Sequence, residues 1–338
     1  MEAYLTNIDP SPTMQIEFPG LFDLQVNGFG GVDFNNHFAT SEDVLRVIEK
    51  IRMTGVTRFL PTLGTSSFER FATCAKTLTR TRHPAIVGLH MEGPYISPED
   101  GPRGAHPRKH VIAASIDDFL RRQEAAEGRI KLVTLAPEAH GAIELIEHLV
   151  GLGIRAAIGH TTGSPEQIRD AVKAGATLST HLGNGCAMQL PRHPNFIWEQ
   201  LATDDLFASF IVDGHHLPPA TLKAMVRAKT PRRTLLVTDA VAAAGCVPGT
   251  YELNGEQVVL SEDGRVFQPG APWLAGAAIT LDRAVANTVK FTGLPLDEVL
   301  PMASSQPAKY LGVQASGRVT ADWNAADYRL SNLKVFDA

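Results

Sequence analysis

Short apolar runs alternate with longer amphipathic segments along most of the chain. Eight of these runs are typical of buried β-strands, namely residues 21–26, 56–60, 86–91, 130–135, 155–159, 176–180, 207–212 and 234–238. Between them, apolar positions recur at helical spacing, which predicts helices at residues 40–53, 67–79, 116–127, 141–152, 196–202 and 218–228. Ser41 is the expected cap of the first helix, and Ser164-Pro165 starts a further one, with proline in its first turn.

Strands that alternate with helices pair in parallel, so the pattern predicts an α/β protein. Eight such strands over about 250 residues suit a (β/α)₈ barrel of the TIM type. An open doubly wound sheet is the alternative, and it needs a glycine-rich phosphate loop after its first strand. The loop after residue 26 reads Gly28-Phe-Gly-Gly31 and lacks the GxGxxG spacing, which favours the barrel.

The rhythm changes after the eighth strand. Asn254-Gly255 and Asp263-Gly264 are hairpin turn signals on either side of residues 257–260, which predicts a β-excursion at about residues 246–270. Helices are expected at 277–292 and 296–309, and the tail from residue 317 has strand character. We therefore expect a catalytic barrel at residues 19–312 and a small accessory β-segment formed by residues 1–18 and 313–338.

Composition narrows the class of protein. The chain has 338 residues, of which 44% are hydrophobic, and a formal net charge of -5 without charge clusters, so no nucleic-acid or membrane surface is expected. No apolar run reaches the roughly 18 residues of a membrane span, and the start lacks the layout of a signal peptide. Cys74, Cys186 and Cys246 lie far apart, which argues against disulfides or a thiolate metal site. These features predict a cytoplasmic protein.

Polar side chains that suit chemistry stand where the predicted strands end. They are Gln25 and Asn27 after the first strand, Glu92 after the third, His160 after the fifth, His181 after the sixth, His215 or His216 after the seventh, and Asp239 after the eighth. Active sites of (β/α)₈ barrels lie at this end of the strands, so these side chains should converge. One carboxylate and two imidazoles make a common hydrolytic zinc shell, and Asp239 is free to take a proton from water.

Several motifs also follow one another in a fixed order over about residues 19–312. They are Pro19-Gly-Leu-Phe-Asp-Leu-Gln-Val-Asn-Gly28, Gly30-Gly-Val-Asp-Phe34, Leu89-His-Met-Glu-Gly-Pro94, Gly104-Ala-His106, Gly159-His160-Thr, Thr180-His181-Leu182 with Asn184, Asp213-Gly-His-His216, Val237-Thr-Asp-Ala240, Ala242-Ala-Ala-Gly245 and Leu274-Ala-Gly-Ala277. Each piece alone is weak, but the ordered set is specific. With it the chain resembles the N-acetylglucosamine-6-phosphate deacetylase family of the amidohydrolase superfamily.

The resemblance implies removal of an acetyl group from N-acetylglucosamine 6-phosphate by metal-bound water. It implies Glu92, His160 and His181 as metal ligands, with Asp239 as general acid/base and His106 polarising the acetyl carbonyl. The residues that it implies for holding the sugar phosphate are Ala105, Asn184, Gly185, His216, Leu274, Ala275 and Gly276. It also implies a homodimer.

The number of metal ions follows from the first strand. Many members of the superfamily carry His-x-His there and bind two metals, whereas this chain has Gln25-Val-Asn27. Amides are poor zinc ligands beside imidazole, so we expect one divalent ion, and Gln25 and Asn27 as hydrogen-bonding neighbours of the site. Zinc is the expected metal, although iron, cobalt and manganese suit the same ligands.

Three features depart from the family pattern. The family usually has Leu-x-Asn-Ala-Met after the sixth strand, whereas this chain has Leu182-Gly-Asn-Gly-Cys-Ala-Met188 and then Arg192, the expected phosphate-binding cation. The portion before the barrel is short, and the tail from residue 317 follows the expected Gly-x-Val pattern only loosely, so the β-domain is expected to be reduced.

Alternatives remain for the function. The same chemistry could serve another amide, such as an unphosphorylated N-acetyl amino sugar, an N-acyl amino acid or a cyclic amide. A non-catalytic barrel that binds a sugar phosphate has no need of a positioned base, so the presence of Asp239 beside a metal shell argues against it. Cys186 is expected to be a packed residue and not a nucleophile.

Overall fold

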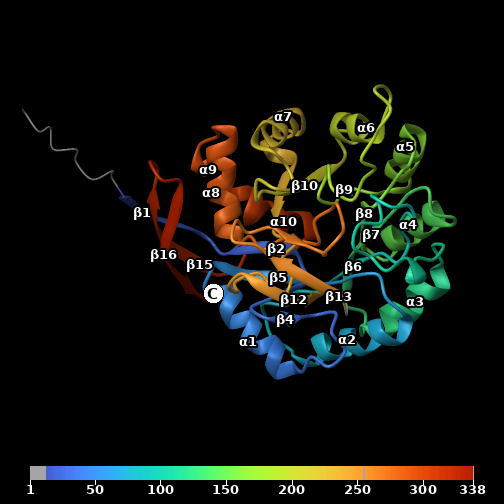
Figure 1. The fold of residues 1–338 in the computed structure, drawn as a ribbon, viewed down its shortest axis with the longest axis horizontal. Helices are drawn as coiled ribbons and strands as arrows, with labels where there is room; N and C mark the ends of the chain where they lie inside the picture. The colour runs from blue at the N-terminus through green and yellow to red at the C-terminus, as the bar shows by residue number, and fades with distance from the viewer. Residues whose placement is uncertain (1–12, 254–255, 338) are drawn as a thin grey trace, which may run out of the picture.

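The computed structural model describes residues 13–253 and 256–337, and its centre is a parallel β-barrel (Figure 1). The strands, in chain order, are β2 (Leu21–Val26), β5 (Val56–Leu63), β6 (Leu89–Glu92), β7 (Ile130–Leu135), β8 (Arg155–Ile158), β9 (Leu178–Ser179), β10 (Phe207–Ile211) and β11 (Thr234–Val237). Each strand pairs in parallel with the next one in this order.

The first and the last strand close the barrel. A parallel bridge joins Val26 to Ala240. The N–H of Asn27 donates to the carbonyl of Ala240 at 2.7 Å, and that of Asp239 donates to the carbonyl of Gln25 at 3.0 Å. An open doubly wound sheet has free edges, so this closure confirms the predicted (β/α)₈ barrel.

Helices follow one another around the outside of the barrel (Figure 1). They are α1 (Ser41–Arg52), α2 (Phe68–Arg80), α3 (Ile116–Ala125), α4 (Ala142–Gly151), α5 (Pro165–Ala174), α6 (Phe196–Ala202), α7 (Pro219–Lys229) and α8 (Leu281–Thr292), with short 3₁₀ turns η1 (Arg108–His110) and η2 (Pro231–Arg233). In α1 the side chains of Val44, Val47, Ile48 and Ile51 form one buried stripe. None of the helices in the described part of the chain is long and apolar enough to cross a bilayer.

Two predicted boundaries near the start of the barrel differ from the structure. The cap of α1 is Thr40 and not Ser41, because Thr40 and Asp43 form a reciprocal capping box. The second strand was expected to end before Pro61, but β5 continues to Leu63. Its ladder with β6 begins only at Thr62, so the missing N–H of Pro61 interrupts no hydrogen bond with that strand.

The two helices after the excursion also differ. The predicted helix 277–292 begins only at Leu281, because Ala277 forms a parallel bridge with Ala240. The predicted helix 296–309 is divided into α9 (Leu296–Val299), η3 (Leu300–Ala303) and α10 (Ser305–Leu311). Pro301 lies in the middle of this segment, where it removes a helical donor.

The β-excursion forms a small antiparallel sheet of β12 (Gly249–Leu253), β13 (Glu256–Leu260) and β14 (Val266–Phe267). It has its own apolar cluster, which includes Val241, Leu253, Val258 and Ala275. Asp263-Gly264 forms the expected turn, with the φ of Gly264 at 87°. The expected turn at Asn254-Gly255 lies outside the described residues.

A separate sheet joins the two ends of the chain. Strand β1 (Thr13–Pro19) pairs antiparallel with β15 (Arg318–Asn324), and β15 with β16 (Arg329–Phe336), beside the barrel in Figure 1. A further short hairpin, β3 (Gly28–Phe29) with β4 (Val32–Asp33), follows the first barrel strand. Residues 1–12 lie outside the described part. The division into a barrel at 19–312 and an accessory segment stays a prediction.

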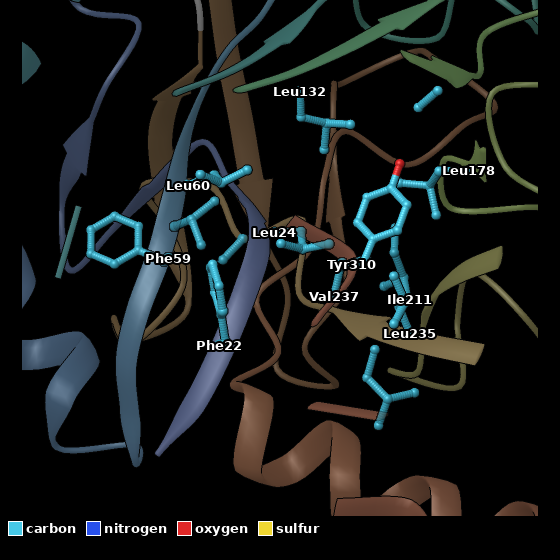
Figure 2. Packing of buried hydrophobic residues seen from close by; sticks show 14 of the residues in the cluster. Phe22, Leu24, Phe59, Leu60, Leu132, Leu178, Ile211, Leu235, Val237 and Tyr310 are labelled. Atoms are coloured by element: carbon cyan, nitrogen blue, oxygen red, sulfur yellow. The ribbon is translucent and has the colours of Figure 1, made fainter. Parts of the chain in front are cut away.

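Figure 2 shows apolar side chains of several barrel strands packed together. Phe22 and Leu24 come from β2, and Phe59 and Leu60 from β5. All four are buried, and the ring of Phe59 stacks on that of Phe34 with centroids 6.0 Å apart. This packing fixes the strands whose ends carry the polar side chains described below.

Replacing Phe59 by alanine should lower the free energy of unfolding by about 3–5 kcal/mol, because the ring is lost from a packed core that collapses only in part. Phe38→Ala is the matched control. Its side chain is 78% exposed, and its effect should stay within about 0.5 kcal/mol. Urea denaturation of the two variants measures both effects, and equal midpoints would contradict the expectation.

Candidate active site

A cavity of about 470 Å³ lies at the C-terminal ends of the barrel strands. Seven of the predicted strand-end residues line it, and Gln25 does not; the seven are Asn27, Glu92, His160, His181, His215, His216 and Asp239. The excursion and the loops after β6, β9 and β10 also contribute to its walls. The closed barrel therefore brings the strand-end residues into one space.

Glu92 is the last residue of β6 and its carboxylate is buried. Its Oε1 atom lies 3.2 Å from His160 Nε2 and 3.0 Å from His181 Nε2, and it accepts a hydrogen bond of 2.8 Å from Gln25 Nε2. Burial alone would raise the pKa of Glu92, but the hydrogen bonds and charges of the two histidines hold it well below its usual range. Glu92 is therefore a carboxylate at neutral pH.

The two histidines beside Glu92 have different surroundings. His160 Nδ1 lies 2.7 Å from the carbonyl oxygen of Pro102, which only accepts, so Nδ1 carries a proton and Nε2 is the nitrogen that faces Glu92. His181 Nδ1 is buried and has no partner among the described residues. Burial opposes protonation of His181, but the hydrogen bond to Glu92 and its charge outweigh this and raise the pKa of His181.

His106 approaches the other side of the carboxylate, with Nε2 at 3.9 Å from Glu92 Oε2. Its Nδ1 atom accepts from the backbone N–H of Thr65 at 3.3 Å and lies 2.8 Å from the Thr65 hydroxyl. Burial, with the positive charge of His160 as a second cause, lowers the pKa of His106 to about 3. His106 is therefore neutral, and the proton is on Nε2, which makes it a hydrogen-bond donor toward the cavity.

These donors fit a divalent metal ion. Ligand atoms of Glu92, His106 and His160 lie within 4.8 Å of one another, and His181 Nε2 contacts the same carboxylate. A carboxylate and imidazole lone pairs are the donor set of hydrolytic zinc sites. Because His106 carries its proton on Nε2, His160 and His181 remain the ligands that we predict together with Glu92.

Asp239 follows β11, and its carboxylate is held by two amides of the first strand. Asn27 Nδ2 donates to Oδ1 at 2.7 Å, and Gln25 Nε2 donates to the same atom at 3.0 Å. Burial, with the charge of Glu92 as a second cause, raises the pKa of Asp239 to about 6. Gln25 thus bridges the two carboxylates, and both amides donate hydrogen bonds to Asp239.

Three site residues have left-handed backbone conformations. The φ angles are 52° at His160, 31° at His181 and 51° at Asp239. Such angles cost about 1–3 kcal/mol in a residue with a side chain and often occur at functional sites. Each of the three residues lies two positions after the end of its strand, and the sharp turn there directs the side chain into the cavity.

A buried carboxylate that the sequence analysis did not single out supports this corner. Asp23 Oδ2 accepts from the hydroxyl of Thr238 at 2.6 Å, and Asp23 Oδ1 accepts from the N–H of Gln25 at 3.1 Å. The Thr238 hydroxyl in turn accepts from the N–H of Ala240 at 3.1 Å. Burial raises the pKa of Asp23 to about 7. Its signal in the sequence is a charged residue inside an otherwise apolar strand.

Most of the predicted substrate-binding residues line the cavity, and two do not. Those in the lining are Ala105, Asn184, Gly185, His216, Leu274 and Gly276. Ala275 is fully buried in the apolar cluster of the excursion, and its N–H donates to the carbonyl of Val266. Arg192 is exposed and lies outside the lining. The structure therefore gives neither residue the expected contact with the cavity.

The structure gives His215 and His216 different surroundings, which bears on which of them contacts the substrate. His216 is partly buried, and its Nδ1 lies 2.6 Å from Asp213 Oδ2, which leaves Nε2 for the cavity. His215 also lines the cavity, but its Nε2 is 2.8 Å from the carbonyl oxygen of Asp263 in the excursion. His215 thus links the loop after β10 to the excursion, and His216 remains the predicted substrate contact.

The sequence analysis missed Leu253 of the excursion and Trp273 of the segment that follows it, and both line the cavity. It also missed Thr65 and Pro102, whose backbone atoms orient His106 and His160. The position of Trp273 directly before the small residues 274–276 was the available signal. No signal in the sequence marked the two backbone contacts.

Metal content should distinguish His181 from His106. His181→Ala should lose most of the bound ion because it removes a predicted ligand, whereas His106→Ala should retain about one equivalent because its Nε2 is protonated. Elemental analysis of both variants, purified from the same metal-supplemented growth, measures this. Loss of metal from His106→Ala alone would reverse the assignment.

Comparisons with known proteins identify the family of the chain. Residues 16–326 match the model of the amidohydrolase family. The chain is 30% identical over 336 residues to an N-acetylglucosamine-6-phosphate deacetylase of Bacillus subtilis, covering 96% of this chain and 82% of that protein. It is 31% identical over 327 residues to an N-acetylgalactosamine-6-phosphate deacetylase of Escherichia coli O157:H7, covering 92% and 84%.

A solved structure gives the same result in three dimensions. It is a variant of N-acetyl-D-glucosamine-6-phosphate deacetylase from Mycobacterium smegmatis in complex with N-acetyl-D-glucosamine-6-phosphate. The TM-score is 0.87 at 29% identity, over 95% of this chain and 85% of that one. The chain therefore belongs to the amidohydrolase family and, within it, to the N-acetylglucosamine-6-phosphate deacetylase family.

Proposed function

We propose that this protein hydrolyses the acetamide of N-acetylglucosamine 6-phosphate, releasing acetate and glucosamine 6-phosphate. The observation that carries the proposal is the convergence of Glu92, His106, His160, His181 and Asp239 on one cavity. A buried carboxylate with a raised pKa beside a metal-type cluster suits amide hydrolysis, which needs a base and an electrophile. The names of the related proteins supply the substrate class.

Glu92, His160 and His181 would hold one divalent ion, with zinc as the proposed metal. The donor set supports this assignment. Such an ion supplies a Lewis acid that lowers the pKa of water toward about 7 and polarises a carbonyl. Gln25 and Asn27 donate hydrogen bonds to the carboxylates, which supports a single ion.

Asp239 would act as the general base and then as the general acid. Its Oδ1 atom is occupied by the two amides of the first strand, so Oδ2 is left to accept the proton of the attacking water. The same atom would then return the proton to the leaving amine. Gln25 and Asn27 hold the carboxylate in the orientation that both transfers need.

His106 would stabilise the charge that develops on the acetyl oxygen. Its neutral ring carries the proton on Nε2, as the contact from the Thr65 N–H requires, so it donates and does not accept. A fixed donor of this kind acts without reorganisation during the reaction. The six lining residues from Ala105 to Gly276 named above would hold the sugar. The family resemblance supports a homodimer, and the sequence features described above favour a cytoplasmic location.

An unphosphorylated N-acetyl amino sugar is the second candidate substrate. No lysine or arginine occurs among the described residues that line the cavity, and Arg192 is exposed outside it. A phosphate group usually meets such a cation or a charged helix end. Comparing kcat/KM for N-acetylglucosamine with and without its 6-phosphate decides between the two substrates.

Asp239→Asn should lower acetate release from N-acetylglucosamine 6-phosphate by about 10²–10⁴-fold, because the amide cannot accept the proton of water. Its metal content should stay unchanged. Asp205→Asn is the matched control, since Asp205 is exposed and away from the cavity, and it should keep full activity. An active Asp239→Asn enzyme would rule out Asp239 as the base.

The rate should also fall in acid. Asp239 accepts a proton only when ionised, and burial together with Glu92 raises its pKa to about 6. Below its pKa the protonated fraction grows, so kcat/KM should fall about tenfold per pH unit. A bound cation lowers the pKa of a nearby carboxyl, so the acid limb should centre at or below about pH 6. A profile that falls between pH 7 and 8 instead would contradict this.

A further inference from the structure

Besides His181 Nδ1, described above, two donor groups of cavity-lining residues have no acceptor within the described chain. The indole Nε1 of Trp273 and the amide Nδ2 of Asn184 are both buried and unpartnered, and both residues line the cavity. Leaving a buried donor unpaired is unfavourable, because the group has lost its hydrogen bonds to water. A ligand that brings acceptor oxygens into the cavity removes this cost, so the two donors indicate where such oxygens lie.

The backbone fixes Trp273 relative to the predicted base. Leu274 forms a bridge with Phe267 of β14, and the N–H of Ala275 donates to the carbonyl of Val266 at 2.9 Å. Two residues further on, the N–H of Ala277 donates to the carbonyl of Asp239 at 3.0 Å. Trp273 therefore lies on a segment that is hydrogen-bonded both to the excursion and to the corner that carries Asp239.

Gly276 makes this close packing possible. Its φ is 68°, and a Cβ at this position would lie 2.3 Å from a methyl group of Val241. Both the positive φ and the lack of space for a Cβ require glycine at this position. The segment is therefore packed closely against the corner that carries Asp239, and Trp273 and Asp239 line the same cavity.

The surroundings of Trp273 select the kind of ligand. Its chain neighbours Pro272 and Leu274 line the cavity with it, as does Leu253, and no lysine or arginine lines the cavity among the residues described. An apolar wall without a cation does not suit a phosphate dianion. It suits a carbon face that also carries hydroxyl oxygens, which is the chemistry of a pyranose ring.

We propose that Trp273 is a specificity-determining residue that packs its indole against the pyranose ring of the substrate and donates its N–H to a ring hydroxyl. The proposal rests on the proposed deacetylase function and names the part of the substrate that Trp273 recognises. It separates amino sugars from acyclic N-acyl amino acids, which lack both the ring face and the hydroxyl. It leaves the acetamide directed toward His106 and Asp239.

The test compares two substitutions at this position. Trp273→Phe keeps an aromatic ring and removes only the N–H, whereas Trp273→Leu removes both. Trp198→Phe is the control, because Trp198 is 57% exposed and does not line the cavity. Each is made alone for kinetics and with Asp239→Asn for binding, so that affinity is measured on metal-loaded protein without turnover.

Trp273→Phe should weaken binding of N-acetylglucosamine and of its 6-phosphate by the same factor, about 3–10-fold, the value of one neutral hydrogen bond. Trp273→Leu should weaken both further, and in the active enzyme KM should rise more than kcat falls. Calorimetric titration gives the affinities, and acetate release gives the kinetics. Trp198→Phe should match the parent protein in both.

Three results would overturn the inference. The first is unchanged affinity in Trp273→Phe. The second is a loss of affinity confined to the phosphorylated sugar, which would place the N–H at the phosphate. The third is that the parent Asp239→Asn protein binds neither sugar. A different result would overturn the proposed function instead. That result is sugar binding that depends on Trp273 in a native enzyme that releases no acetate.

Discussion

The buried charge of Glu92 is the constraint on which the rest of the site depends. An ionised carboxylate in a protein interior is stable only when charges or hydrogen bonds compensate it. Here the compensation comes from Gln25, His160 and His181, which stand at the ends of three other strands. Only a closed parallel barrel brings these ends to one point. The fold and the electrostatics therefore require each other.

The carboxylate of Asp239 lies close to that of Glu92, but the pKa values of the two groups are shifted in opposite directions. Glu92 has three nitrogen partners and a pKa well below its usual range, while the pKa of Asp239 is raised to about 6. One amide side chain, that of Gln25, contacts both. Pushing two neighbouring carboxyl pKa values apart assigns one to permanent charge and the other to proton transfer. The choice of amides at residues 25 and 27 is what permits this division.

The barrel could be predicted from the sequence because its strands and helices are set by local periodicity, and Glu92, His160, His181 and Asp239 followed from their places at strand ends. The misplaced details depend on contacts between distant segments. The exposure of Arg192 and the burial of Ala275 are set by how loops pack on the barrel, which periodicity does not encode. The tautomer of each histidine depends on backbone atoms of Thr65 and Pro102, and no side-chain pattern marks those.

The seam between the first and the last barrel strand has a consequence for folding. Gln25 and Asp239 are 214 residues apart in the chain, yet their side chains share a hydrogen bond. A second hydrogen bond, from the Thr238 hydroxyl to Asp23, joins the same two ends of the barrel. Contacts of such long range form late, because chain entropy opposes them until the intervening structure exists. An unfinished barrel can thus assemble Glu92 with its histidines and still lack an oriented base. Competence for catalysis would then emerge only when the two ends of the barrel meet, so turnover itself reports that the ring has closed.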